Sequence, residues 1–152
     1  MSFAISSLTE NELPEYEAIS AISGVEYEYG YTQADNGTFK GTDENDYFVT
    51  SGKKDKIECN AGDDAVVNQG GKKKVVDTGD GKDIYSLDIS NIAKKGKTKL
   101  TDFESGVDKV VVDGNAKVKG YGTKKLTITS GKKTHTIKSK EDAFDRDDVD
   151  FI

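Results

Sequence analysis

The chain has 152 residues, of which 34% are hydrophobic and 33% charged, and its net charge is −6. This composition is poor in apolar residues for one compact domain, but 16 glycines, 7 tyrosines and 6 phenylalanines argue against simple disorder. Cys59 is the only cysteine, so an internal disulfide is excluded. No segment approaches the roughly 20 apolar residues of a membrane span. Residues 1–13 lack the basic start and apolar run of a secretory signal, so we expect any export to use another signal.

Charge is distributed unevenly along the chain. Residues 1–46 carry a net charge of −9, residues 47–140 carry +8 and residues 141–152 carry −5. A basic middle segment fits either an anionic partner or charge matching across the folded surface. Charge matching is the ordinary outcome, because surface charge mainly serves solubility.

The first forty residues predict two elements. Residues 15–22 predict a short acidic helix, and Val25–Tyr31 alternates with a period of two, which is typical of a strand. Val25, Tyr27, Tyr29 and Tyr31 would share one face of this strand. We expect that face to cover the N-terminal open end of the fold that follows. The alternative is a tyrosine-lined ligand surface.

Residues 41–87 repeat with a period close to nine. Phe48, Ile57, Val66 and Val75 are each nine residues apart, and Tyr85 follows ten residues later. Turn-forming residues lie between them, so each unit predicts a turn of about six residues and a strand of about three. When two such units make one coil, the expected fold is all-β, a short parallel β-helix.

Three of the turns are acidic: Gly41 to Asp46, Asn60 to Asp64, and Thr78 to Asp83. They resemble the G-G-x-G-x-D-x-U-x nonapeptide of the RTX (repeats-in-toxin) family. The resemblance implies a calcium-binding parallel β-roll, in which turn carbonyls and aspartates share Ca²⁺ between neighbouring coils. The implied ligands are Gly41, Asp43, Asp46, Asn60, Gly62, Asp64, Thr78, Asp80 and Asp83. Three acidic turns leave two gaps, so about two ions are expected, although no unit carries the complete G-G-x-G.

The intervening turns, residues 51–55 and 70–74, are basic. Their lysines are predicted to replace the metal cation; these are Lys53, Lys54, Lys73 and Lys74. Lys73 lies two residues before Val75, where the acidic units carry aspartate, and is expected to reach Asp55. The alternative is an anionic partner, such as an acidic polysaccharide or a cell surface. Lysine runs without interleaved aromatic residues or arginine indicate no specific binding of nucleic acid.

The C-terminal part predicts a β cap. Residues 99–113 resemble the segment after the repeats in serralysin-type proteases and alginate epimerase modules, which implies Asp102 and Asp108 as further ligands. The alternative is a capping strand without metal. Residues 125–137 predict a hairpin around Ser130 and Gly131, with His135 at the surface. The residues of this hairpin expected to face inward are Leu126, Ile128 and Ile137, and Val118, which precedes the hairpin, is expected to face inward as well.

The last three residues, Asp150, Phe151 and Ile152, resemble the uncleaved signal of type I secretion substrates, the alternative being an ordinary last strand. No nucleophile elbow, H-E-x-x-H, phosphate loop or dinucleotide motif occurs, so we expect no enzyme activity. The predicted organisation is an N-terminal cap (1–40), an RTX-like β-roll (41–98) and a C-terminal cap of antiparallel strands (99–152). The predicted function is that of a secreted calcium-binding protein with a structural or binding role, which folds on calcium after type I secretion. The alternative is an accessory polysaccharide-binding module of a secreted enzyme.

Overall fold

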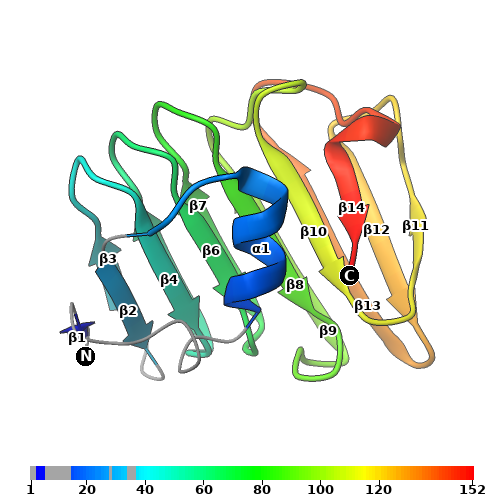
Figure 1. Ribbon diagram of the computed structural model, residues 1–152. Helices are drawn as coiled ribbons and strands as arrows, with labels where there is room; N and C mark the ends of the chain where they lie inside the picture. Colours follow the sequence, from blue (N-terminus) through cyan, green and yellow to red (C-terminus); the bar gives the residue numbers. More distant parts are fainter. Residues whose placement is uncertain (1–2, 6–14, 28, 34–36) are drawn as a thin grey trace.

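The computed structural model of the chain describes residues 3–5, 15–27, 29–33 and 37–152 (Figure 1). Within these ranges the chain is mostly β, with two seven-stranded sheets and one α-helix, α1 (Tyr16–Ser23). The expectation of an all-β chain with parallel strands and a minor N-terminal helix is confirmed at this level. None of the described helices is long and apolar enough to cross a membrane.

From β2 to β11, the strands of the two sheets alternate along the chain. In sheet order, the first sheet contains β1 (Phe3–Ile5), β2 (Tyr29–Gln33), β4 (Asp46–Thr50), β6 (Ala65–Asn68), β8 (Ile84–Asp88), β10 (Lys109–Asp113) and β14 (Val149–Phe151). The second contains β11 (Lys117–Lys119), β12 (Lys125–Ser130), β13 (Lys133–Ser139), β9 (Lys95–Leu100), β7 (Lys73–Asp77), β5 (Lys54–Glu58) and β3 (Gly37–Lys40). From β4 to β10, each strand pairs in parallel with the strand two places earlier in the chain. Each of these strands is therefore separated in the chain from its parallel partner by one strand of the other sheet.

Parallel pairing does not stop at residues 41 and 98. It begins with β2 and β3, and it continues beyond β9 because β13 pairs with β9 and β14 pairs with β10. The predicted hairpin is confirmed, since β12 and β13 are antiparallel and join at residues 131–132. The expectation that the C-terminal strands are antiparallel throughout is wrong. The physical reason is that the chain passes through the second sheet between β8 and β10 and again between β10 and β14, so each strand returns in the same direction. Val110 and Val149 thereby extend the same buried column as Tyr85.

The main core lies between the two sheets and is built from columns of single residues. Phe48, Val66 and Tyr85 stack in the first sheet, while Ile57 and Val76 stack in the second. All five are at most 1% exposed. Burying each of these side chains contributes roughly 1.5–3 kcal/mol.

The predicted inward position of Val75 is wrong, because Val76 is buried and Val75 is partly exposed. The ten-residue step lies between Val66 and Val76, not between Val75 and Tyr85. The extra residue falls in the turn of residues 70–72, before β7. This one-residue shift changes which lysine points inward.

Helix α1 covers the outer face of the first sheet, in front of β6 and β8 in Figure 1. Tyr16 and Ile19 pack with Tyr47 and other residues of that face. The helix ends at Ser23 and is capped by Gly24, whose φ of 74° is left-handed and whose N–H donates to Ser20 O at 2.8 Å. The helix prediction is therefore confirmed to within one residue at each end.

The predicted strand over Val25–Tyr31 is displaced, because the strand begins at Tyr29 and ends at Gln33. Tyr27 lies before it and packs its ring against Tyr16 and Tyr47, with centroids 5.8 and 5.2 Å apart. The side chains of Tyr29 and Tyr31 lie outside the described residues. The tyrosine cluster therefore helps to fix α1 on the sheet.

Candidate metal centre

Four buried aspartates form a row along one side of the first sheet. Asp46 begins β4, and Asp64, Asp83 and Asp108 each directly precede β6, β8 and β10. Their exposed fractions are between 0% and 2%. We call these four residues the acidic row. Such deep burial is rare for aspartate unless the carboxylate is paired or binds metal.

Hydrogen bonds connect the acidic row from coil to coil. The N–H of Asp46 donates to Asp64 Oδ1 at 2.8 Å, and the N–H of Asp64 donates to Asp83 Oδ1 at 2.8 Å. The N–H of Asp83 donates to Asp108 Oδ1 at 2.9 Å. Each of these three carboxylates therefore uses one oxygen to hold the preceding coil.

The second oxygens of the row are not equivalent. Asp46 Oδ2 accepts from the N–H of Thr42 at 2.7 Å, and Asp108 Oδ2 accepts from the N–H of Glu104 at 2.9 Å. Among the described residues, Asp64 Oδ2 and Asp83 Oδ2 are buried without any hydrogen-bond partner. These two oxygens belong to aspartates of successive coils and are hard donors of the type that Ca²⁺ prefers.

The pKa values of the aspartates in the row reflect this difference between their second oxygens. Burial raises the pKa of Asp64 to about 9 and that of Asp83 to about 10. Burial also raises the pKa of Asp108, but only to about 6, because the N–H groups of Glu104 and Asp83 stabilise its charged form. The single N–H bond that each of Asp64 and Asp83 accepts at Oδ1 does not offset this burial, and Oδ2 of each has no partner among the described residues.

The acidic turns stack closely enough that glycine is required in them. Gly62 has a φ of 95°, and a Cβ there would lie 2.4 Å from Glu44 O. Gly81 has a φ of 106°, and its Cβ would lie 2.2 Å from Gly62 O. Carbonyl oxygens of one turn therefore face the backbone of the next turn, beside the row of carboxylates.

Two of the departures from the glycine pattern have structural roles. Asn60 adopts a left-handed φ of 64° and donates from Nδ2 to Gly41 O at 2.6 Å. The hydroxyl of Thr42 donates to the Asp46 carboxylate, at 3.0 Å from Oδ1. Sequence reasoning missed the contact made by Thr42, which a hydroxyl beside an acidic turn could have indicated. Polar groups of the first acidic turn, Gly41 O and the Asp46 carboxylate, therefore accept their hydrogen bonds from other residues of the protein.

The remaining predicted ligands lie outside the row. Asp43 and Asp80 are exposed. Asp102 accepts from the N–H and hydroxyl of Thr78 at 2.7 and 2.8 Å, and also from the N–H of Gly79. Asp102 thus holds the third acidic turn in place through its own hydrogen bonds.

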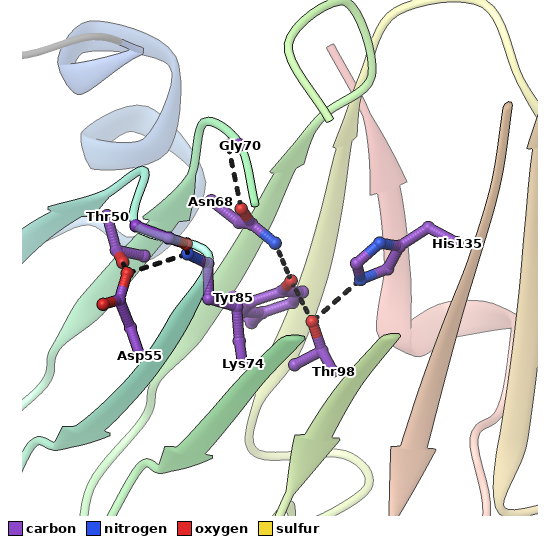
Figure 2. Close-up of polar contacts among 9 residues, drawn as sticks. Thr50, Asp55, Asn68, Gly70, Lys74, Tyr85, Thr98 and His135 are labelled. Carbon is purple, nitrogen blue, oxygen red and sulfur yellow. Dashed lines mark hydrogen bonds and ion pairs between the residues drawn. The ribbon is translucent and has the colours of Figure 1, made fainter. Parts of the chain in front are cut away.

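On the opposite side, one lysine is buried. The side chains of Lys74 and Asp55 are 0% exposed, with Nζ 2.8 Å from Asp55 Oδ2 (Figure 2). Lys74 Nζ also donates to Gly52 O, and the Thr50 hydroxyl donates to Asp55 Oδ2. Burial lowers the pKa of Lys74, while the bond to Asp55 opposes that shift.

The prediction that Lys73 reaches Asp55 is wrong by one residue. The register pairs Lys73 with Lys54 and Lys74 with Asp55, as the extra residue before β7 requires. Lys53, Lys54 and Lys73 are exposed. Of the four predicted lysines, Lys74 therefore has the position in which an ammonium group meets a buried carboxylate and a turn carbonyl.

A buried polar chain runs across the core from this side (Figure 2). Asn68 Nδ2 donates to the Tyr85 hydroxyl at 2.9 Å, which lies 2.6 Å from Thr98 Oγ1. Thr98 Oγ1 lies 2.8 Å from His135 Nε2. The predicted surface position of His135 is wrong, because it is 0% exposed. Its separation of two residues from buried Ile137 could have indicated the same inward face.

Protonating His135 is expected to destabilise the fold. Burial, and then the charge of Lys74, lower its pKa from 6.5 to about 4, so the folded state favours neutral histidine. A depressed histidine pKa gives stability that is present above pH 6.5 and is lost as the pH falls toward 4. We expect wild type to lose roughly 3 kcal/mol more than His135→Asn over this range, measured by urea unfolding. Equal losses in both proteins would contradict the assignment.

A second acidic cluster joins Glu15, Asp88 and Asp113, with one oxygen of each within 4.8 Å of the others. Asp88 and Asp113 are register partners, and Glu15 precedes α1. Burial raises the pKa of Glu15 to about 7, although Ser86 donates to its carboxylate. Sequence reasoning missed this cluster; the signal was that Asp88 and Asp113 each end a strand.

The C-terminal residues form a strand on the first sheet. Val149–Phe151 pairs in parallel with β10, and Asp150 lies 2.9 Å from Lys109 Nζ. Phe151 and Ile152 are 44% and 38% exposed. The end of the folded chain therefore offers two apolar side chains at the surface.

Comparison with known proteins does not identify a family for this chain. No protein-family model matches the chain, and no curated protein matches it. What the chain does is therefore inferred from the acidic row and its surroundings.

Proposed function

We propose that this chain is a secreted calcium-binding protein built on a β-roll of the RTX type. The observation that carries the proposal is the pair of buried carboxylate oxygens, Asp64 Oδ2 and Asp83 Oδ2, that lack a hydrogen-bond partner within the described residues. A native fold seldom buries such groups without compensation. Calcium would supply that compensation.

The repeat geometry supports the β-roll. Asp46, Asp64 and Asp83 bond one another at separations of 18 and 19 residues, which is one coil of two strands and two turns. Aspartates at equivalent places of successive coils therefore come into direct contact. In this arrangement the acidic turns stack on one side and the basic turns on the other.

Two ions fit the chemistry of the row. Asp64 and Asp83 would hold them, together with carbonyl oxygens of the stacked turns that contain Gly62 and Gly81. The second oxygens of Asp46 and Asp108 already accept backbone N–H groups, so these two residues support the sites from either end. On the other side Lys74 takes the place of a metal ion.

This arrangement couples folding to calcium. Without a cation, Asp64 and Asp83 must be buried either protonated or as uncompensated charges, and both states cost free energy at neutral pH. A chain of this kind is less stable in a calcium-poor cytosol and gains its full stability in a calcium-rich exterior, so we expect folding to be completed after export. Asp150, Phe151 and Ile152 would then be recognised by the type I secretion machinery before β14 forms. The role outside the cell would be structural or binding, without enzyme activity.

Calcium titration of EGTA-treated protein tests the proposal. Each ion that binds only the folded state adds about 2.7 kcal/mol of stability when its concentration is 100 times its Kd. We expect far-UV circular dichroism to gain strand signal, or the Tm to rise, as calcium is added. Magnesium at the same concentration is the control. Mg²⁺ is smaller than Ca²⁺, requires near-ideal octahedral geometry and loses its water ligands reluctantly, so carbonyl-rich turns bind it poorly. A protein that folds equally well in EGTA and in calcium would refute the calcium function.

A further inference from the structure

The outer face of the second sheet carries a dense set of exposed lysines. They come from five adjacent strands, β5, β7, β9, β13 and β12, and all are exposed. We call them the lysine face; its members are Lys54, Lys56, Lys73, Lys95, Lys97, Lys99, Lys125 and Lys138.

The strand register arranges six of these lysines in two rows that cross the strands. Lys54, Lys73 and Lys97 are successive register partners in one row. Lys99, Lys138 and Lys125 are successive partners in the other. Neighbours within a row are therefore about 4.8 Å apart at the backbone, and the rows are about 7 Å apart along the strands.

Most of this charge is not neutralised on the surface. Among the described residues, Lys73, Lys97, Lys99, Lys125 and Lys138 have no carboxylate within 4.0 Å. Two shallow hollows of about 370 and 440 Å³ lie over the face, and Lys73, Lys97 and Lys138 line both. Closely spaced like charges repel one another and concentrate anions, so a polyanion laid along the rows would gain favourable contacts.

We propose that the lysine face binds a linear acidic polysaccharide, with the sugar chain running along the rows and across the strands. A linear polymer with regularly spaced carboxylates matches cations that the register spaces regularly from strand to strand. The five strands contain no arginine, tyrosine, phenylalanine or tryptophan. The face therefore lacks the stacking platforms and bidentate groups that nucleic-acid surfaces use. This proposal does not depend on calcium binding by the acidic row.

A charge-matched pair of variants tests the proposal. Lys73→Thr/Lys97→Thr/Lys99→Thr removes three cations from the face and keeps residues that favour strands. Lys82→Thr/Lys124→Thr/Lys132→Thr removes three exposed lysines outside it. Binding of a short oligouronate is measured by calorimetry at low and high salt, after circular dichroism has shown that each protein is folded.

We expect the face variant to bind about ten-fold more weakly, because each exposed ion pair changes an equilibrium constant roughly two-fold. The control variant should stay within about two-fold of wild type, and high salt should weaken binding by wild type. If the triple variant does not fold, Lys125→Thr/Lys138→Thr takes its place, with about a four-fold loss expected.

Three outcomes would overturn the proposal: wild type fails to bind the oligouronate, the control variant weakens as much as the face variant, or duplex DNA or anionic vesicles bind more tightly at the same ionic strength. Binding by wild type that is lost only in the face variant would support it. The titration is run at a fixed calcium concentration at which the protein is fully folded. Calcium dependence is scored separately, so failure of one proposal does not affect the other.

Discussion

Replacing both Asp64 and Asp83 by asparagine is expected to abolish the calcium response while leaving the fold intact. Asparagine keeps an Oδ1 that can accept the N–H bonds from Asp46 and Asp64, but it removes both buried charges. In EGTA the variant should melt at or above the wild-type temperature, because no buried carboxyl has to be neutralised. At a calcium concentration 100 times Kd, wild type should gain about 5 kcal/mol from two ions. That gain is roughly 10–20 °C in Tm for a chain of this length.

The control for this experiment is Glu141→Gln/Asp147→Asn, which removes two exposed acids. It changes the net charge by the same amount and should retain the whole calcium shift. The measurement is differential scanning calorimetry in EGTA and in calcium. Retention of the wild-type calcium shift by Asp64→Asn/Asp83→Asn would show that the acidic row holds no ion.

Lys74→Met is expected to destabilise the protein by about 3–5 kcal/mol, the usual cost of removing one partner of a buried ion pair. Methionine fills a similar volume, so the loss comes from leaving the Asp55 carboxylate buried without its cation. The same variant also removes the hydrogen bond to Gly52 O, which joins two basic turns. Urea unfolding in EGTA and in calcium measures the change, and both conditions should show it because this cation belongs to the chain.

Lys73→Met is the matched control, because Lys73 is the neighbouring residue and is exposed. It should change stability by no more than about 0.5 kcal/mol. Lys74→Met/Asp55→Val should recover most of the loss, since removing both charges leaves none uncompensated. A Lys74→Met protein that unfolds at the wild-type urea concentration would contradict the assigned role. A larger loss in Lys73→Met than in Lys74→Met would also contradict it.

Much of the candidate metal centre follows from local sequence. The nine-residue spacing of Phe48, Ile57 and Val66 predicts short strands of opposite sheets, because a fixed period places equivalent residues on equivalent strands. Acidic and basic turns alternate along the chain, so the same period separates them onto two sides. Asp46, Asp64 and Asp83 could therefore be grouped from the sequence alone.

The spacing of the repeat does not predict which carboxylate oxygens lack a hydrogen-bond partner. Asp64 Oδ2 and Asp83 Oδ2 lack partners, whereas the second oxygens of Asp46 and Asp108 bond Thr42 and Glu104. Asp46, Asp64 and Asp83 occupy the same place in the repeat, and Asp108 follows in the capping segment. The difference depends on how each turn folds over its neighbour, and on residues such as Thr42 that break the pattern.

The sequence by itself determined the periodic strands, the side of each turn, the hairpin and the short helix, because these depend on spacing and on residues close in the chain. The tertiary structure decided the register of β7. Val75 and Val76 are both apolar and β-branched, so the local pattern permits either to face inward. Pairing of Val76 with Ile57 and Leu100 fixes the choice and places Lys74 against Asp55. The burial of His135 and the position of α1 were decided likewise, because contacts between residues far apart in the chain select the face that each one covers.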